Sequence, residues 1–353
     1  MSGDALLSFG VEVEMLLTPK TDETVKDRYD LATAIADYHN SQFNTSNDLK
    51  MLALREGSEM ILNKEGFKVW GLVNDGTVIP PKDSGQFSME LTSPILDFDQ
   101  GGDWRDHVRK ALCSVEALAQ INTNISCGTH VHISPGRGLQ WTEDELREIS
   151  HAIIFFEGAF LKLVLESRRD NANCKSNGLG IRLAGKKPEL CWERLLKHTS
   201  RDQLIRAMNP DDRFYAWNFR NMFPESEDGL NGEHCNGYTL EWRLAPGVTT
   251  AEGCLMWTEL ALNFVQVARQ PGAHEMLVDK KKRTVECLGE FIANSMDERV
   301  SDKRYLKPVF EHKSGRFSPV EYGSNKIFTD TDEEDKHQQE MLEKLRQQDN
   351  AWR

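Results

Sequence analysis

The segment that decides the fold reads Cys127-Gly128-Thr129-His130-Val131-His132-Ile133-Ser134. Successive side chains of an extended strand point to opposite faces, so the two histidines share one face while Val131 and Ile133 share the other. Imidazole nitrogens need partners when they are buried, because an unpaired polar group is costly. We therefore predict a β-strand with one apolar face and one face of ligand groups.

Three further stretches divide in the same way, over residues 11–15, 88–92 and 240–244. Their polar sides carry, in chain order, Glu12, Glu14, Glu90, Glu241 and Arg243. If the four strands belong to one sheet, its polar face gathers four carboxylates, two histidines and an arginine. We predict that this face is the active site.

Length and composition indicate a globular protein that can bury a sizeable core. The chain has 353 residues, of which 39% are hydrophobic and 28% charged, which suits one large domain or one domain with an appendage. We predict a catalytic domain over residues 1–296. Residues 297–353 are expected to form a polar extension, partly helical or disordered, in which 330–335 hold five acidic residues.

Charge and cysteine content argue against several classes of protein. A net charge of −13 without a basic patch argues against nucleic acid as the main partner. Seven cysteines without CxxC spacing indicate reduced thiols rather than disulfides or a structural zinc site. The sequence shows no secretory signal and no run of about 18 apolar residues, so we expect a cytoplasmic protein without a membrane partner. No feature specifies an oligomeric state.

Periodicity and turn signals place the remaining elements. Strands are expected at 8–17, 68–73 and around Glu90, whereas 50–54 fits a strand or a helix. Helices are expected over about 22–38, 103–120, 142–167, from 200, 249–268 and 283–294. Their expected caps are Asp103, Thr142 with Glu145, Ser200 with Gln203, and Thr249 with Glu252. This order favours an α+β fold with a largely antiparallel sheet and helices on its outer face.

The polar face suits divalent cations. Clustered carboxylates raise one another's pKa, so the group makes sense with cations present, and oxygen ligands suit Mg²⁺ or Mn²⁺ shared with nucleotide phosphates. Three alternatives stay open: a solvated sheet face, one liganding and one structural histidine, or a zinc site built on His130 and His132. Zinc would require a third histidine or a lone carboxylate.

The arginines are candidates for binding anions. Arg243 could bind phosphate or carboxylate in bidentate fashion, or only pair with Glu241. Arg220 is a second candidate, and Arg168 and Arg169 are expected at the surface, within reach of an anionic substrate. Cys127 could be a nucleophile, although such a cysteine is usually a small buried residue. The phosphate-binding loops of nucleotide enzymes are missing from the sequence.

Five segments in order resemble the amidoligase family of carboxylate–amine ligases, which is related to glutamate–cysteine ligase and glutamine synthetase. They are residues 9–15, Trp70 with 75–77, 89–96, 127–132 and 239–243. Thr129 and Thr92 depart from the family's more typical Leu and Val, and neither change removes a reactive group. The resemblance covers residues 8–265.

The resemblance implies a curved antiparallel sheet whose concave face binds ATP and Mg²⁺. Metal ligands would be Glu12, Glu14, Glu90, Glu241 and His132. His130 and Arg243 would contact the phosphates and stabilise the transferring phosphoryl group, with Glu90 sharing in catalysis. The substrate side would include Trp70, Asp75, Arg168 and Arg220, the last also near the nucleotide.

From this we expect an ATP- and Mg²⁺-dependent ligase that forms an amide through an acyl phosphate. Its substrates would be a small carboxylate and an amine, on an amino acid, peptide or related metabolite. A zinc hydrolase that uses the histidine pair and a nucleotide-binding module without turnover are the alternatives. Fold alone does not choose among them, because the same sheet also supports phosphotransfer to guanidino nitrogens.

Overall fold

The structure is a computed structural model. It describes residues 7–20, 25–45, 48–55, 67–99, 101–169, 171–178, 195, 200–223, 238–277 and 283–316, with the single positions 340, 344 and 347. Apart from these three positions, residues 317–353 of the expected polar extension lie outside the described residues.

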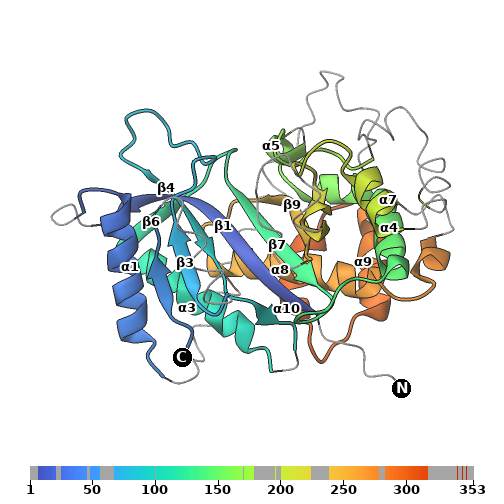
Figure 1. Cartoon of the computed structure of the whole chain (residues 1–353), viewed down its shortest axis with the longest axis horizontal. Coiled ribbons are helices and arrows are strands. Elements are labelled where there is room, and N and C mark those ends of the chain that lie inside the picture. The colour runs from blue at the N-terminus through green and yellow to red at the C-terminus, as the bar shows by residue number, and fades with distance from the viewer. Residues whose placement is uncertain are drawn as a thin grey trace.

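The molecule is organised around β1 (Ser8–Pro19), which runs diagonally across Figure 1. It belongs to a nine-stranded sheet of order β2-β3-β4-β1-β7-β9-β8, and β5 and β6 also pair with β1. The other strands are β2 (Met51–Ala53), β3 (Trp70–Val73), β4 (Phe87–Thr92), β5 (Leu96–Asp97), β6 (Ala119–Asn122), β7 (Gly128–Ser134), β8 (Trp217–Asn218) and β9 (Leu240–Pro246). Only β2 and β3 pair in parallel among these strands, which confirms a largely antiparallel sheet. The short strands β5, β6 and β8 were not predicted.

The helices pack mainly on one side of this sheet, and Figure 1 shows α3, α8 and α10 behind β1 and β7. Their bounds are α1 (Arg28–Gln42), α3 (Asp103–Leu118), α4 (Glu143–Leu163), α5 (Glu166–Arg169), α7 (Arg201–Met208), α8 (Ala251–Ala268), α9 (Val285–Ser295) and α10 (Lys303–Phe310), with 3-10 turns η1 (Arg220–Met222) and η2 (Ala273–Leu277). Within the described ranges, no helix has both the length and the apolar character that a membrane span requires.

Helix starts follow their capping residues. Thr142 and Glu145 form the predicted capping box of α4, and Ser200 accepts from the Gln203 amide at the start of α7. The cap of α8 is Thr250 rather than Thr249, because its side chain accepts from the Gly253 amide. Gly102, in the left-handed region at φ 69°, precedes α3, so Asp103 is its first residue rather than its cap.

The core fills the space between the sheet and these helices. Its densest part is aromatic: the Trp217 and Trp242 rings stack at 5.8 Å, and Phe160 meets Phe264 edge to face at 4.8 Å. Each such side chain buries roughly 150–250 Å², so at about 25 cal/mol per Å² this group is a major stabilising contact. Trp242 comes from β9 between Glu241 and Arg243, so alternation separates the apolar core from the polar face.

The segment 297–316 contributes buried residues to this core. Tyr305 and Val309 are fully buried and pack with the rest of the core. Arg105, on α3, pairs with Glu259 of α8 and donates to the Val300 carbonyl at 2.7 Å. This buried ion pair fastens the segment after α9 to the helices behind the sheet.

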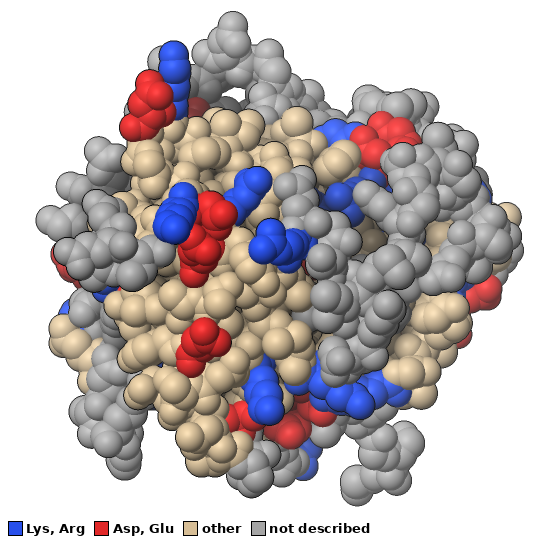
Figure 2. All heavy atoms as spheres, turned by 60° about the vertical axis from the view of Figure 1, so that its left-hand side comes forward, with Lys and Arg blue, Asp and Glu red and all other residues tan. Residues whose placement is uncertain are grey.

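Figure 2 shows the face that lies toward the left in Figure 1. Its described side chains are mainly uncharged, and the few basic and acidic ones are scattered over it. On the described part of this face, therefore, no basic patch gathers that would suit a nucleic-acid backbone.

Candidate active site

Strand register brings the predicted ligand residues to one face. Along β1, Glu12 lies opposite His130 of β7, and Glu14 lies opposite Glu90 of β4. On the next pair of strands His132 lies opposite Glu241. Residues paired across an antiparallel ladder point to the same side, so one face of four neighbouring strands collects these six side chains.

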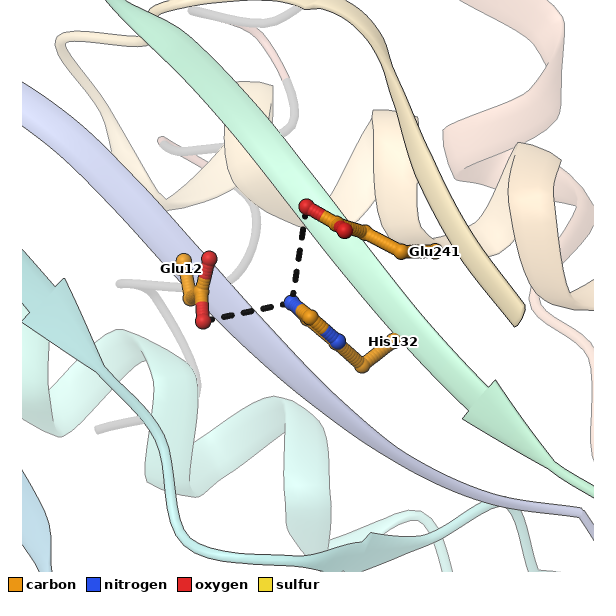
Figure 3. A group of neighbouring side chains, drawn as sticks. All are labelled: Glu12, His132 and Glu241. Atoms are coloured by element: carbon orange, nitrogen blue, oxygen red, sulfur yellow. Dashed lines mark ion pairs between the residues drawn. The ribbon is translucent and has the colours of Figure 1, made fainter. Parts of the chain in front are cut away.

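The first cluster consists of Glu12, His132 and Glu241, each from a different strand (Figure 3). His132 Nε2 lies 3.2 Å from Glu12 Oε1 and 3.7 Å from Glu241 Oε1. One ligand atom from each residue lies within 4.8 Å of the other two. Two carboxylate oxygens and one imidazole nitrogen at this spacing can surround a single cation.

Mutual attraction sets the protonation of this cluster. Burial opposes the charged form of all three groups, but the neighbouring charges outweigh it. The carboxylates raise the pKa of His132 to about 9. In turn Arg243 and the imidazoles lower the pKa of Glu241 to about 2, and the imidazoles hold the pKa of Glu12 well below its ordinary value. The carboxylates are therefore ionised at neutral pH, as metal ligands must be.

The second cluster is purely acidic and consists of Glu14, Asp75 and Glu90, again within 4.8 Å. Asp75 lies just beyond β3, where its Oδ1 accepts from the Thr77 amide at 2.6 Å. Burial and the like charges around Glu90 raise its pKa well above the ordinary value, and burial raises the pKa of Glu14. Three repelling carboxylates form a site that a divalent cation would relieve.

His130 and Arg243 lie beside these clusters. His130 Nδ1 is 3.4 Å from Glu12 Oε2, and its Nε2 is 3.8 Å from Glu14 Oε1. Arg243 pairs through Nη1 with Glu241 Oε1, and its Nε donates to the Asn173 carbonyl at 3.2 Å. Both side chains are buried, with His130 3% and Arg243 8% exposed. The charge of Arg243 therefore acts in a weakly screened environment.

A β-bulge between β7 and β9 lies at Arg243 and Leu244. Thr129 pairs with Ala245 and Val131 with Trp242, so two residues of β9, Arg243 and Leu244, face one residue of β7. Bulges re-aim side chains and are frequent beside active sites. Alternation along β9 already places Arg243 on the same side as Glu241, and the bulge begins at Arg243.

Gly128 is required by close packing at the start of β7. Its amide donates to Glu14 Oε2 at 2.6 Å. A Cβ atom here would lie 2.8 Å from His130 Nε2 and 3.1 Å from Arg168 Nη2. Any larger residue would displace groups of the site.

The structure corrects the expected surface position of Arg168 and Arg169, because both are buried. Arg168 donates to the carbonyl oxygens of Arg243 at 2.6 Å and, more weakly, Leu244 and Cys127. Arg169 donates to two carbonyls at the end of α4, where the last turn of a helix leaves carbonyls without intrahelical partners. Arg168 thus supports the strands under the site and does not face open solvent.

The structure also corrects the expected position of Trp70 on the substrate side. Gly71 and Val73 lie opposite Thr92 and Glu90, so they occupy the polar face. Trp70 alternates to the other face and lies in the hydrophobic core, 1% exposed. A buried indole on the far face cannot touch a substrate above the carboxylates, so Trp70 leaves the candidate substrate site.

Arg220 lies close to the site, and its side chain contacts Asn209 and Phe223. It begins η1, its Nη1 lies 3.4 Å from the Asn209 carbonyl, and its guanidinium lies 5.6 Å from the Phe223 ring. Its backbone amide, however, contacts Asn218, which bonds Glu241.

Sequence reasoning missed three polar residues that contact the first cluster. Asn218 and Asn221 donate to Glu241 Oε2, and Thr239 contacts His132. Neutral amides and hydroxyls in a turn-rich segment carry no charge signal, although the aromatic residues around Asn218 indicate that its segment is buried.

The donor sets fit divalent cations with oxygen preference. His132 Nε2 is buried and makes no well-formed hydrogen bond within the described structure, which leaves it directed at the Glu12 and Glu241 oxygens. His130 is absent from both three-residue groups, so the geometry does not favour a zinc site on the His-x-His pair. Cys127 is fully buried, and burial raises the pKa of its thiol, which disfavours a nucleophile.

Comparisons with known proteins give a family match. Residues 6–265 match a family described as "Putative amidoligase enzyme". No curated protein matches the sequence.

Two solved structures are similar at low identity. A bifunctional glutathione synthetase from Pasteurella multocida is 10% identical with a TM-score of 0.38, over 87% of this chain and 46% of that one. A glutamine synthetase from Plasmodium falciparum is 11% identical with a TM-score of 0.33, over 75% and 51%. The matched region spans about half the length of either protein.

Proposed function

The chain belongs to the amidoligase family, and from this premise we propose that it is an ATP- and Mg²⁺-dependent ligase that joins a carboxylate to an amine. The observation that carries the proposal is the pair of metal-type clusters on one sheet face, with a buried arginine beside them. An anionic protein binds a highly charged nucleotide only where cations offset its phosphates, and this face offers sites for such cations.

Glu12, His132 and Glu241 would hold one cation, and Glu14, Asp75 and Glu90 another. Mg²⁺ suits the all-carboxylate set, and Mn²⁺ suits the set with a nitrogen ligand. When bound, these ions would neutralise the phosphate charge during transfer. The low pKa values of Glu12 and Glu241 keep these two ligands ionised at neutral pH, whereas a bound cation would displace the proton that the raised pKa leaves on His132.

Arg243 and His130 would act on the transferring phosphoryl group. The Arg243 side chain is buried beside Glu241 and supported by the Asn173 carbonyl, so its donors are positioned before substrate arrives. Such preorganised charge stabilises the charge that develops on transfer. His130 lies between Glu12 of the first cluster and Glu14 of the second. It could therefore contact phosphate oxygens of a nucleotide bound across both clusters.

The proposed reaction has two steps. A substrate carboxylate oxygen attacks the γ-phosphorus of ATP, which yields an acyl phosphate and ADP. The amine nitrogen then attacks the acyl carbon, the C–O bond to phosphate breaks, and the nitrogen loses a proton. The departing phosphate can take up that proton, and Glu90 would share in catalysis through the cation that it holds with Glu14 and Asp75. The acid and amine would come from amino acids, peptides or related small metabolites.

Phosphate release from ATP with Mg²⁺ tests the proposal, measured across pools of amino acids and dipeptides with mass spectrometry of the products. We expect a product lighter by one water than the sum of two pool members, with ADP formed in step. Glu12→Gln and Glu241→Gln should each abolish turnover in a folded protein, whereas the exposed Glu298→Gln should retain it.

Other outcomes would contradict the ligase. Bound zinc with hydrolysis of a substrate would indicate the hydrolase. ATP binding without ADP formation in any pool would indicate a binding module. Unchanged turnover in both site variants would refute the site itself.

A further inference from the structure

The two carboxylate oxygens of Glu241 have different surroundings. Oε1 faces the site, where it pairs with Arg243 and lies 3.7 Å from His132 Nε2. Oε2 points the other way and accepts from Asn218 Nδ2 at 2.7 Å and from Asn221 Nδ2 at 3.3 Å. Glu241 therefore has one oxygen held by amides and one directed at the cluster.

Hydrogen-bond chemistry fixes the orientation of both amides. The Arg220 backbone amide can only donate, so the Asn218 atom 2.8 Å away must be its Oδ1. The Nδ2 group of Asn218 then donates to Glu241 and, at 3.3 Å, to Asn221 Oδ1. Because Asn221 Oδ1 accepts this hydrogen bond, the Nδ2 group of Asn221 is the one that faces Glu241 Oε2.

The same chain of hydrogen bonds reaches a second member of the cluster. Asn221 Nδ2 lies 3.5 Å from Thr239 Oγ1, which lies 3.2 Å from His132 Nδ1. A hydroxyl that accepts the Nδ1 proton leaves Nε2 free to coordinate, and Nε2 is the nitrogen that faces Glu12 and Glu241.

The segment that carries the asparagines is itself firmly held. Asn218 is fully buried and lies opposite Glu241 in the β8–β9 pair. Asn209 bonds the backbone on both sides of Asn218: it donates to the Trp217 carbonyl and accepts from the Phe219 amide. The amide donors are therefore positioned by the backbone before any ion binds.

We propose that Asn218, Asn221 and Thr239 are positioning residues that aim Glu241 Oε1 and His132 Nε2 at one point, so that Glu241 binds a divalent cation through a single oxygen. This inference rests on the proposed metal site of the ligase and adds residues to it. Outer partners of this kind typically change metal affinity about 10–100-fold.

Mn²⁺ alone is the probe, titrated into the full-length protein without nucleotide while free Mn²⁺ is followed by electron paramagnetic resonance. We expect Asn218→Ala to weaken the tightest binding by about 10–100-fold. Asn221→Ala and Thr239→Val should weaken it by less, since each removes a longer contact. These two residues are only partly buried, so their variants decide the question if Asn218→Ala does not fold.

A matched control is available on the far side of the sheet. Asn263 is also buried, and its Nδ2 donates to a buried carboxylate, Glu259 Oε2, at 3.0 Å. Asn263→Ala removes the same chemical contact away from the site. It should lower stability and leave Mn²⁺ affinity unchanged.

A double-mutant cycle tests whether Asn218 acts through Glu241. In a Glu241→Gln background the loss caused by Asn218→Ala should vanish, because the residue it positions is gone. Wild-type binding with unchanged affinity in all three positioning variants would overturn this inference and leave the ligase proposal standing. Absence of Mn²⁺ binding by the wild type would overturn both.

Discussion

Glu90→Gln should make the protein more stable when no divalent cation is present. Glu90 lies within 4.8 Å of Glu14 and Asp75, and Thr92 Oγ1 donates to its Oε1 at 3.0 Å. Glutamine keeps the shape and can keep the threonine contact through its own Oε1. The substitution removes one of the three repelling carboxylates from the partly buried cluster of Glu14, Asp75 and Glu90.

The magnitude follows from two limits. At an effective dielectric of about 20, two unit charges 4.8 Å apart repel by about 3.5 kcal/mol. Proton uptake limits this penalty, because Glu90 can become neutral in the folded state. Near pH 7, about 2.5 units above its ordinary pKa of 4.5, neutralisation costs about 3.4 kcal/mol. We therefore expect a gain of about 1–3 kcal/mol near pH 7.

The gain should shrink toward acid pH. The pKa of Glu90 is raised in the folded protein by burial and by the neighbouring carboxylates. The folded state thus holds a proton that the unfolded chain has released, and the wild type loses stability as pH rises above 4.5. Below that pH both states are protonated, and the variant has no advantage.

Urea denaturation followed by tryptophan fluorescence, in chelator and then in excess Mg²⁺ or Mn²⁺, measures this effect. Cation should reverse the order, because an ion at about a hundred times its dissociation constant stabilises the wild type by about 2.7 kcal/mol. Glu157→Gln is the contrast: Glu157 is buried away from other acids and accepts from Ser176 and Gly178, so the amide should destabilise. A Glu90→Gln protein less stable than wild type in chelator near pH 7 would refute the reasoning.

Two further predictions concern stability. Arg105→Met should cost about 1–3 kcal/mol in urea denaturation, because the buried Glu259 and the Val300 carbonyl lose their donor. Proton uptake limits this cost, since burial raises the pKa of Glu259 to about 7; adding Glu259→Leu should recover part of the loss, and a variant as stable as the wild type would contradict a stabilising pair. His39 is buried between Ser114 Oγ and the Leu49 carbonyl, and burial lowers its pKa from 6.5. Its neutral form is favoured by folding, so stability should fall as pH drops below 6.5, and a His39→Gln protein should show a shallower fall over the same acid range in thermal melts.

Alternation was sufficient to predict the centre of the sheet and most of the candidate cluster. A strand has a period of two, so the parity of Glu12 and Glu14, and of His130 and His132, determines which residues share a face. The same rule gave Glu90 and Glu241. Their convergence then depends only on the four strands being neighbours, which they are.

Other features depend on contacts that parity does not specify. Trp70 is the neighbour of Gly71, which occupies the polar face, so its own side chain points to the opposite face. The resemblance to the family did not reveal this orientation. Arg168 is buried because the carbonyls of Cys127, just before β7, and of Arg243 in β9 accept hydrogen bonds from its guanidinium, although both are distant from it in sequence. The role of Asn218 could be recognised only from its hydrogen bond to Glu241 in the folded protein. The bulge at Arg243 is a register shift between strands, which no local pattern encodes.

The pairing of β1 with β7 has a consequence for how the molecule assembles. Glu12 and His130 are 118 residues apart, and Arg105 and Glu259 are 154 apart. Contacts between distant segments require large loops to close and slow the folding of a domain. During synthesis, β1 and β4 can pair early, but β9, with Glu241 and Arg243, emerges only after two-thirds of the chain has been made. The candidate cation-binding face therefore cannot form before β9 has been made, and only a chain in which β9 has paired with β7 can hold the complete first cluster.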